Sequence, residues 1–234
     1  MQIKERSDWD LGMFARFSVT VQFRNRICGG IPKSPDLIDG WISSIINSKS
    51  KVRSLTEETR DKMISGAIQA ETIAVMEPEE DAADHAWCGF AKPDGLAIAG
   101  RQVKAGLKEA ASILSGKTQI WGFKSKMADH VFVEDDWVLL GVDEPSGMDE
   151  GPVHVTSRFG EPQTALKRHD YVERPQITFT IKAIDQPLKD KKKNDIHPKA
   201  YLQLCLELLQ ELGLGANRSQ GWGRFDVVSC EAID

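Results

Sequence analysis

The residues best suited to chemistry lie in one glycine-rich stretch near the C-terminus, residues 213–225, with the sequence GLGANRSQGWGRF. It holds four glycines, two arginines and a serine: Gly213, Gly215, Gly221, Gly223, Arg218, Arg224 and Ser219. Glycine adopts a positive φ without a Cβ penalty and lets a ligand approach the backbone closely. Successive backbone amides in such a loop can bind an anion, and arginine offers a planar fork suited to phosphate. The stretch therefore predicts an anion-binding loop.

Two common nucleotide-binding motifs do not fit this loop. The dinucleotide fingerprint requires a third glycine where Arg218 stands, and it connects a strand to a helix, whereas this loop follows a leucine-rich helical run and precedes an apolar run. The loop also has no Gly-Lys-Ser/Thr, which excludes a P-loop there. The simplest alternative is a tight helix-to-strand connection whose arginines bind nothing.

A second basic segment begins where the apolar run 96–99 enters a turn at Gly100. The helical pattern that follows carries Arg101, Lys104 and Lys108 near its start. A helix N-terminus attracts phosphate through its free amides and its dipole. The alternative is an ordinary amphipathic helix with solvated lysines.

Together the two segments resemble the RAMP superfamily, the repeat-associated proteins of CRISPR effector complexes. Residues 213–223 closely match its C-terminal loop of the form G-x-G-x-x-R-S-x-G-x-G, and residues 101–108 stand at the place of its basic helix, L-K-G-x-L-R. Residues 165–175 are also similar. The usual Ser-Ser before the helix is replaced by Gln102-Val103. The resemblance covers most of the chain from about residue 13, and it is greatest for the backbone-forming subunits that bind guide RNA.

This resemblance implies a protein that binds single-stranded RNA by its sugar-phosphate backbone, with the glycine-rich loop and the basic helix lining one groove. It implies a homo-oligomer or a multi-subunit ribonucleoprotein in the cytoplasm, with no cofactor and no metal. It also implies a thumb between the second and third core strands that reaches along the RNA. The basic residues that the thumb would contribute are Arg158, Lys167 and Arg168.

Other functions stay open at this point. An endoribonuclease of the same superfamily would need a catalytic residue, for which Asp36 and His154 are the candidates. Asp36 also lies in the first turn of an expected helix, where an acid is stabilised by the helix dipole. A virus-encoded relative that binds single-stranded nucleic acid, or a protein-interaction module, is a further alternative, and DNA in place of RNA is not excluded.

The elements that must position these residues predict an α+β fold. Alternating apolar and polar residues predict strands over 13–28 and 177–183, and shorter apolar runs predict strands over 130–140 and 225–228. A 3.6-residue period predicts helices over 101–114 and from Pro198 to Leu212, the second ended by Gly213. The order strand, helix, strand, strand, helix, strand is that of a ferredoxin-like, or RRM-like, βαββαβ core.

We expect residues 1–234 to form a single domain with two insertions, at about 29–100 and 141–175. The first holds two expected helices, within 34–45 and 56–76, and an expected hairpin of 87–91 with 96–99. The second is the thumb, in which only 153–156 resembles a strand.

Composition agrees with a globular domain of this kind, with 41% apolar and 28% charged residues. The net charge of −5 argues against nonspecific coating of nucleic acid, but the basic residues gather in a few segments. The four cysteines are scattered and form no C-x-x-C pair, which predicts free thiols in a reducing compartment. No apolar run is long enough to span a bilayer, and the polar N-terminus is unlike a signal peptide.

Overall fold

The computed structural model describes residues 12–33, 86–156 and 162–233. The chain divides into two compact units: unit 1 comprises residues 1–26, 99–138 and 174–234, and unit 2 comprises residues 27–98 and 139–173. Unit 2 nearly coincides with the two expected insertions, 29–100 and 141–175. The helices expected within 34–76 lie outside the described residues, as do Asp36 and Arg158.

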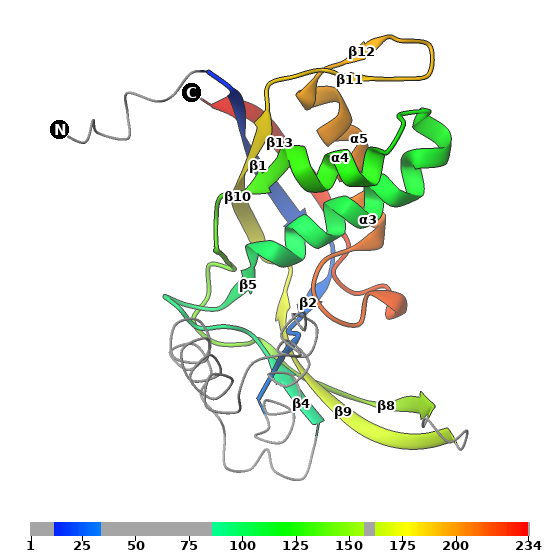
Figure 1. Ribbon diagram of the computed structural model, residues 1–234. Helices are drawn as coiled ribbons and strands as arrows, with labels where there is room; N and C mark the ends of the chain where they lie inside the picture. Colours follow the sequence, from blue (N-terminus) through cyan, green and yellow to red (C-terminus); the bar gives the residue numbers. More distant parts are fainter. Residues whose placement is uncertain (1–11, 34–85, 157–161, 234) are drawn as a thin grey trace, which may run out of the picture. The chain divides into compact units, whose positions relative to one another are not determined.

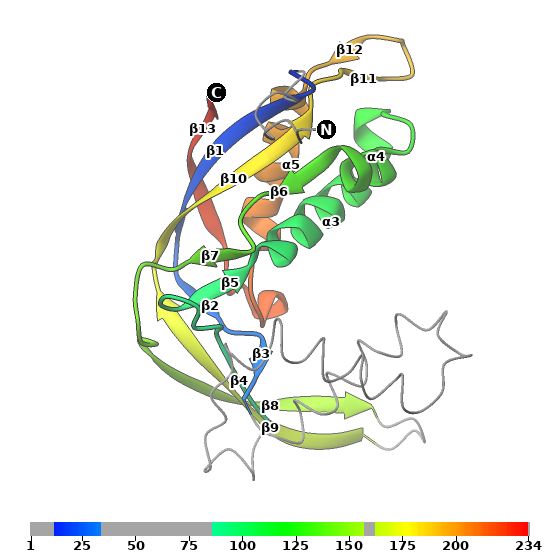
Figure 2. The ribbon, with the colours of Figure 1, turned by 60° about the vertical axis from the view of Figure 1, so that its left-hand side comes forward.

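Four antiparallel strands form the main sheet of unit 1, in the order β13–β1–β10–β6. Figure 1 labels β13, β1 and β10, and Figure 2 labels all four. The central strand β1 (Phe14–Phe23) pairs along its length with β10 (Gln176–Ile184) and with β13 (Phe225–Ile233). The short strand β6 (Val131–Val133) pairs with the end of β10. Alternate side chains are buried as the sequence pattern predicts, and the buried face of β1 consists of Phe17, Val19, Val21 and Phe23.

Helices α3 (Gly100–Thr118), α4 (Phe123–His130) and α5 (Pro198–Leu212) lie on one face of this sheet (Figure 2). The predicted inward stripe of α3 is buried at Val103, Leu107, Ala110 and Ala111. Helix α5 buries a matching leucine-rich stripe, which includes Leu202, Cys205 and Leu209. The packing of helices on an antiparallel sheet confirms the predicted α+β class.

The single strand predicted over 130–140 is wrong in detail. The structure has β6 and a separate strand β7 (Trp137–Leu139), which pairs with β5 (Ala97–Ala99), and His130 belongs to α4. Between β6 and β7, Oδ2 of Asp135 accepts a hydrogen bond from the Thr180 amide at 2.6 Å, and the carbonyl of Asp136 accepts one from the Gly100 amide at 2.8 Å. A Cβ on Gly100 would lie 1.9 Å from the Asp135 carbonyl oxygen, so only glycine fits at this start of α3.

Unit 2 contains a second sheet in the order β2–β9–β4–β3, with β8 also paired to β9. Its strands are β2 (Arg26–Cys28), β3 (Ile31–Pro32), β4 (Ala86–Gly89), β8 (Gly147–Thr156) and β9 (Pro162–Glu173). The expectation of a thumb with one short strand is therefore corrected to two long antiparallel strands. Their residues are largely polar and show no regular apolar alternation, so the usual strand signal is missing.

The hairpin expected around residues 93–95 is confirmed only at its turn. Ala91 and Ala97 form an antiparallel bridge, with the Ala97 amide 2.9 Å from the Ala91 carbonyl. The flanking strands turn to other partners, since β4 pairs with β3 and β9 while β5 pairs with β7. Two further short strands, β11 (Leu188–Lys189) and β12 (Asp195–Ile196), form a hairpin before α5.

A buried ion pair lies in unit 2 and was not expected from the sequence. The Lys33 ammonium lies 2.7 Å from Oδ2 of Asp170, and the indole N–H of Trp87 donates to Oδ1 of the same carboxylate at 2.7 Å. A Cβ on Gly89 would lie 2.6 Å from Oδ2 of Asp170, so the carboxylate sits directly over the glycine. Asp170, on β9, thus contacts Trp87 on β4 and Lys33, the residue that follows β3. No helix in the described parts of the chain is both long enough and apolar enough to cross a membrane.

Candidate nucleic-acid interface

The glycine-rich loop needs its glycines because of its backbone conformation. Gly213, Gly215, Gly221 and Gly223 have φ values of 77°, 85°, 84° and 76°. These values lie in the left-handed region, where any other residue carries a steric cost. The amide of Gly213 donates to the Leu209 carbonyl at 2.8 Å and ends α5, as predicted for a C-terminal glycine.

The two arms of the loop, residues 213–215 and 221–224, meet in direct backbone contact. The Leu214 amide donates to the Gly223 carbonyl at 2.9 Å, and the Gly223 amide donates to the Arg26 carbonyl at 2.9 Å. A Cβ on Gly223 would lie only 1.8 Å from the Leu214 carbonyl oxygen. Leu214 itself is buried and anchors the loop to the core. The backbone contact between the two arms therefore closes the loop.

Closure of the loop also reduces the number of amides that a ligand could use. The amide of Gln220 donates to the Asn217 carbonyl, and that of Gly221 donates to the Arg218 carbonyl, within the short 3-10 turn Arg218–Gln220. With Gly213, Leu214 and Gly223, five loop amides therefore donate to carbonyls of the protein. Fewer loop amides are therefore left for an anion than the glycine content indicates.

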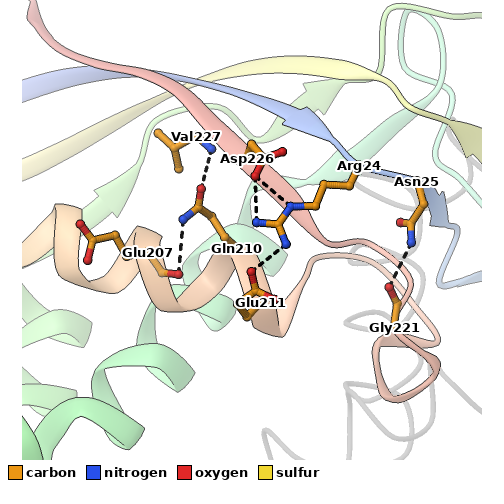
Figure 3. Close-up of polar contacts among 8 residues, drawn as sticks. All are labelled: Arg24, Asn25, Glu207, Gln210, Glu211, Gly221, Asp226 and Val227. Carbon is orange, nitrogen blue, oxygen red and sulfur yellow. Dashed lines mark hydrogen bonds and ion pairs between the residues drawn. The ribbon is translucent and has the colours of Figure 1, made fainter.

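Polar side chains from α5 and from the two residues between β1 and β2 fix the ends of the loop (Figure 3). The Arg24 guanidinium lies 2.7 Å from Oε1 of Glu211 and 2.8 Å from Oδ1 of Asp226, so it joins the end of α5 to the start of β13. Nδ2 of Asn25 donates to the Gly221 carbonyl at 3.3 Å. Oε1 of Gln210 accepts a hydrogen bond from the Val227 amide at 2.8 Å. These contacts hold the loop from both sides.

Arg218 connects the loop to α3. Its Nη1 donates to Oε2 of Glu109 at 2.8 Å, and both side chains are partly exposed, at 36% and 43%. Gly106 lets α3 pack closely against α5 and the loop. A Cβ there would lie 2.7 Å from Cδ1 of Leu209 and 3.3 Å from Cδ2 of Leu214. The loop therefore lies against the middle of α3, which brings together two segments predicted to act as one site.

Lys104 lies on a different side of α3 from Glu109. Its ammonium donates to the carbonyls of Met127 and Ala128, each at 2.9 Å, in the last turn of α4. Burial, together with the nearby Lys108 charge, lowers the pKa of Lys104 to about 8. A positive charge at a helix C-terminus is stabilising, so Lys104 joins α4 to α3 in this structure.

The other predicted residues of unit 1 remain accessible to solvent. Arg101 in the first turn of α3 is exposed, Lys108 is half-buried, and Ser219 and Arg224 in the loop are exposed. At about 100° per residue around a helix, Arg101 and Lys108 lie on the same face of α3, about two turns apart, and this face is separate from the buried stripe.

Three residues at this site were not predicted from the sequence: Glu109, Arg26 and Trp222. The guanidinium of Arg26 lies over the Trp222 ring, 3.7 Å from its centroid. The motif itself offered a signal for Trp222, since an aromatic residue stands between two of its glycines. No signal in the sequence links Arg26 or Glu109 to the loop, because both meet it only through folding.

The predicted thumb residues belong to unit 2. Lys167 and Arg168 lie on β9, where Nε of Arg168 is 3.1 Å from Oε2 of Glu150, and His154 lies on β8. Among the described residues, no group of three or more His, Cys, Asp or Glu side chains is placed to hold a metal ion.

Comparisons with known proteins found similarity among solved structures only. No family model matches the chain, and no curated protein matches it. Among solved structures, the chain is similar to a chain in the cryo-EM structure of the Type III-B Cmr-beta bound to cognate target RNA. The identity is 14% and the TM-score 0.46, and the match covers 95% of this chain but only 61% of that chain.

Proposed function

We propose that this chain is a RAMP-type protein that binds single-stranded RNA by its sugar-phosphate backbone, as the guide-RNA-binding subunits of CRISPR effector complexes do. The observation that carries the proposal is the contact between Arg218 and Glu109, at 2.8 Å, because it unites the glycine-rich loop and the basic helix α3 in one surface. The sequence resemblance of these same two segments supplies the ligand class. A ribonucleoprotein of several subunits is the assembly that the resemblance implies.

The arrangement of unit 1 supports a ferredoxin-like core as part of this proposal. In chain order the core elements are β1, α3, β6, β10, α5 and β13. Their strands lie in the sheet order β13–β1–β10–β6, with the fourth strand beside the first, and all pairs are antiparallel. We treat unit 2 as the insertions of a single domain that spans residues 1–234.

Four cationic side chains would provide most of the grip: Arg101, Lys108, Arg218 and Arg224. Arg218 uses one nitrogen for Glu109, and a guanidinium has further N–H donors that a phosphate can accept. The glycines keep the loop surface free of side chains, so a phosphate can approach the backbone. Contacts of this kind carry no sequence information, and binding is expected to be largely independent of sequence.

The test is fluorescence anisotropy of a labelled single-stranded RNA titrated with the full chain at several salt concentrations. For single strands, log K falls with log salt by about 0.7 per phosphate contact. Arg101→Ala, Lys108→Ala and Arg224→Ala should each weaken binding and lower this slope by about 0.7. Lys192→Ala, in the turn between β11 and β12 of the same unit, removes an equal charge away from the loop and should leave the slope unchanged.

Failure of the wild-type chain to bind RNA at low salt would contradict the proposal. A DNA strand of the same sequence, tested in parallel, decides whether the 2′-hydroxyl contributes. Recovery of intact RNA from the titration, with and without Mg²⁺, separates binding from cleavage. If cleavage does occur, Asp36→Ala and His154→Ala test the two candidate catalytic residues.

A further inference from the structure

The glycine-rich loop carries an aromatic side chain that its own folding does not use. Two apolar residues anchor the loop to the core, Leu214 at 2% exposure and Phe225 at 0%. Trp222 lies between them in the chain but stays only half-buried. A large aromatic ring left partly in water next to a predicted RNA site is better explained by a ligand than by core packing.

On the basis of the proposed function, we propose that Trp222, backed by Arg26, is a stacking platform for one nucleobase of the bound single strand. Base stacking on aromatic rings tolerates any sequence, because every base has a π-face. A backbone grip together with one stacked base would favour single strands over duplexes, whose bases are already stacked. The proposed ligand is therefore an unpaired strand with its bases present, and not any polyanion.

The ring is held in place before any ligand binds. The Arg26 guanidinium covers it at 3.7 Å from the centroid, and the indole N–H donates to Oε1 of Gln220 at 3.3 Å. The Gly223 amide, next to Trp222 in the chain, donates to the Arg26 carbonyl at 2.9 Å, so backbone and side chains of the two residues are fixed together. A preorganised ring loses little side-chain entropy when a base stacks on it.

The charges around the ring suit a nucleotide. Arg26 contributes a cation at the ring itself, and Arg218 and Arg224 lie within four residues of Trp222 in the same loop. By contrast, the nearby Arg24 is bound by two carboxylates, from Glu211 and Asp226, in the structural clamp at the loop ends. Arg26 thus places one cation at the ring, and Arg218 and Arg224 of the same loop would contact the phosphates flanking a stacked base.

The experiment compares two labelled single strands of equal length, one with all its bases and one with abasic sites along its centre. Anisotropy titrations at low salt use the wild-type chain, Trp222→Ala and Trp222→Phe. Trp121→Ala is the matched control, since Trp121 is 82% exposed and lies in the turn between α3 and α4. Thermal unfolding of each variant confirms that it is folded, and Trp222→Phe keeps an aromatic ring should the alanine variant fail to fold.

The wild-type chain should bind the complete strand about 5- to 150-fold more tightly than the abasic strand. Trp222→Ala should abolish this preference, while Trp222→Phe and Trp121→Ala should keep most of it. Equal binding of both strands by the wild-type chain, or an unchanged preference in Trp222→Ala, overturns the platform but leaves the backbone grip intact. Absence of binding to either strand overturns the proposed function itself, and the platform with it.

Discussion

Gly221 and Gly223 share a left-handed backbone but differ in what surrounds them. A Cβ on Gly223 would meet the Leu214 carbonyl oxygen at 1.8 Å, whereas a Cβ on Gly221 would meet nothing within 4 Å. Gly221→Ala should therefore lose only the conformational term, about 1–2 kcal/mol. Gly223→Ala must also separate two backbone segments, and it should lower the free energy of unfolding by about 3 kcal/mol or more.

Urea unfolding of the two variants beside the wild-type chain measures this difference. Similar losses of unfolding free energy in both variants would mean that the contact between the two loop arms is not rigid. Because both substitutions add the same methyl group at a similar φ, the comparison isolates the close approach of the arms.

Lys104 makes the stability of unit 1 depend on pH. Its pKa falls from an ordinary value of 10.5 to about 8 on folding, mainly through burial. Between these values the unfolded chain holds a proton that the folded chain has lost, so the contribution of Lys104 to stability rises with pH from about 8 to about 10.5. Replacement by methionine keeps much of the side-chain volume and removes the titration.

The free energy of unfolding of the wild-type chain, relative to Lys104→Met, should therefore increase between pH 8 and pH 10. Urea titrations of both proteins at pH 7, 8, 9 and 10 provide the measurement. A constant difference across this range would show that folding does not lower the pKa of Lys104.

At the scale of elements, two of the three glycines of α3, Gly106 and Gly116, have opposite roles. Gly106 is buried where α3 meets Leu209 of α5, but Gly116 is exposed, with nothing within 4 Å of an added Cβ. Gly116→Ala should stabilise the protein by about 0.5 kcal/mol, because alanine favours a helix over glycine and no neighbour opposes it. Thermal and urea unfolding measure the gain.

Gly106→Ala is the control for this prediction. It offers the same gain in helix propensity, but its methyl group must displace the tip of Leu209, which lies 2.7 Å away. It should therefore be less stable than Gly116→Ala. A larger gain at Gly106 than at Gly116 would contradict the close packing of α3 on α5.

The elements that the sequence predicted best are those with a strict period and a buried face. Strands β1 and β10 alternate along most of their length, and α5 has a continuous leucine-rich stripe between Pro198 and Gly213. Helix α4 was missed because it is eight residues long and buries only Phe123 and Met127. Strands β8 and β9 were missed because they are joined by backbone pairing and by polar contacts such as that between Arg168 and Glu150.

The pairing of the glycine-rich loop with the basic helix followed from the resemblance, whereas the side-chain contacts that join them did not follow from the sequence. The glycine positions in the loop follow from local backbone needs, which the sequence expresses directly. Lys104 was assigned to a phosphate surface because it lies near the start of the basic helix, and the carbonyls that it contacts belong to α4, a helix that the sequence did not predict. Contacts such as that between Arg218 and Glu109 join residues 109 positions apart and depend on the tertiary fold.

At the scale of the whole molecule, unit 2 has a buried charged group of its own. This is the carboxylate of Asp170, which binds Lys33 and Trp87. Loss of one partner from a buried ion pair typically costs about 3–5 kcal/mol. Asp170→Ala should therefore destabilise unit 2 strongly, and hydrogen exchange followed by mass spectrometry should show faster exchange in β4 and β9.

Exchange in β1, β10 and β13 of unit 1 should change far less, because compact units open as separate cooperative segments. Glu150→Ala is the matched control in unit 2, since it breaks the partly exposed pair with Arg168 and should cost less than about 1 kcal/mol. Equal acceleration of exchange in both units after Asp170→Ala would show that the chain opens as one cooperative segment.

The central place of β1 in its sheet has a consequence for biosynthesis. Its partners β10 and β13 come late in the chain, and the clamp residues Arg24 and Asp226 are 202 positions apart. Strand β1 therefore leaves the ribosome long before β10 or β13 has been made, and its edges stay unpaired until then. Because contacts so distant in sequence form slowly and expose strand edges meanwhile, the nascent chain is open to aggregation until translation has passed β13.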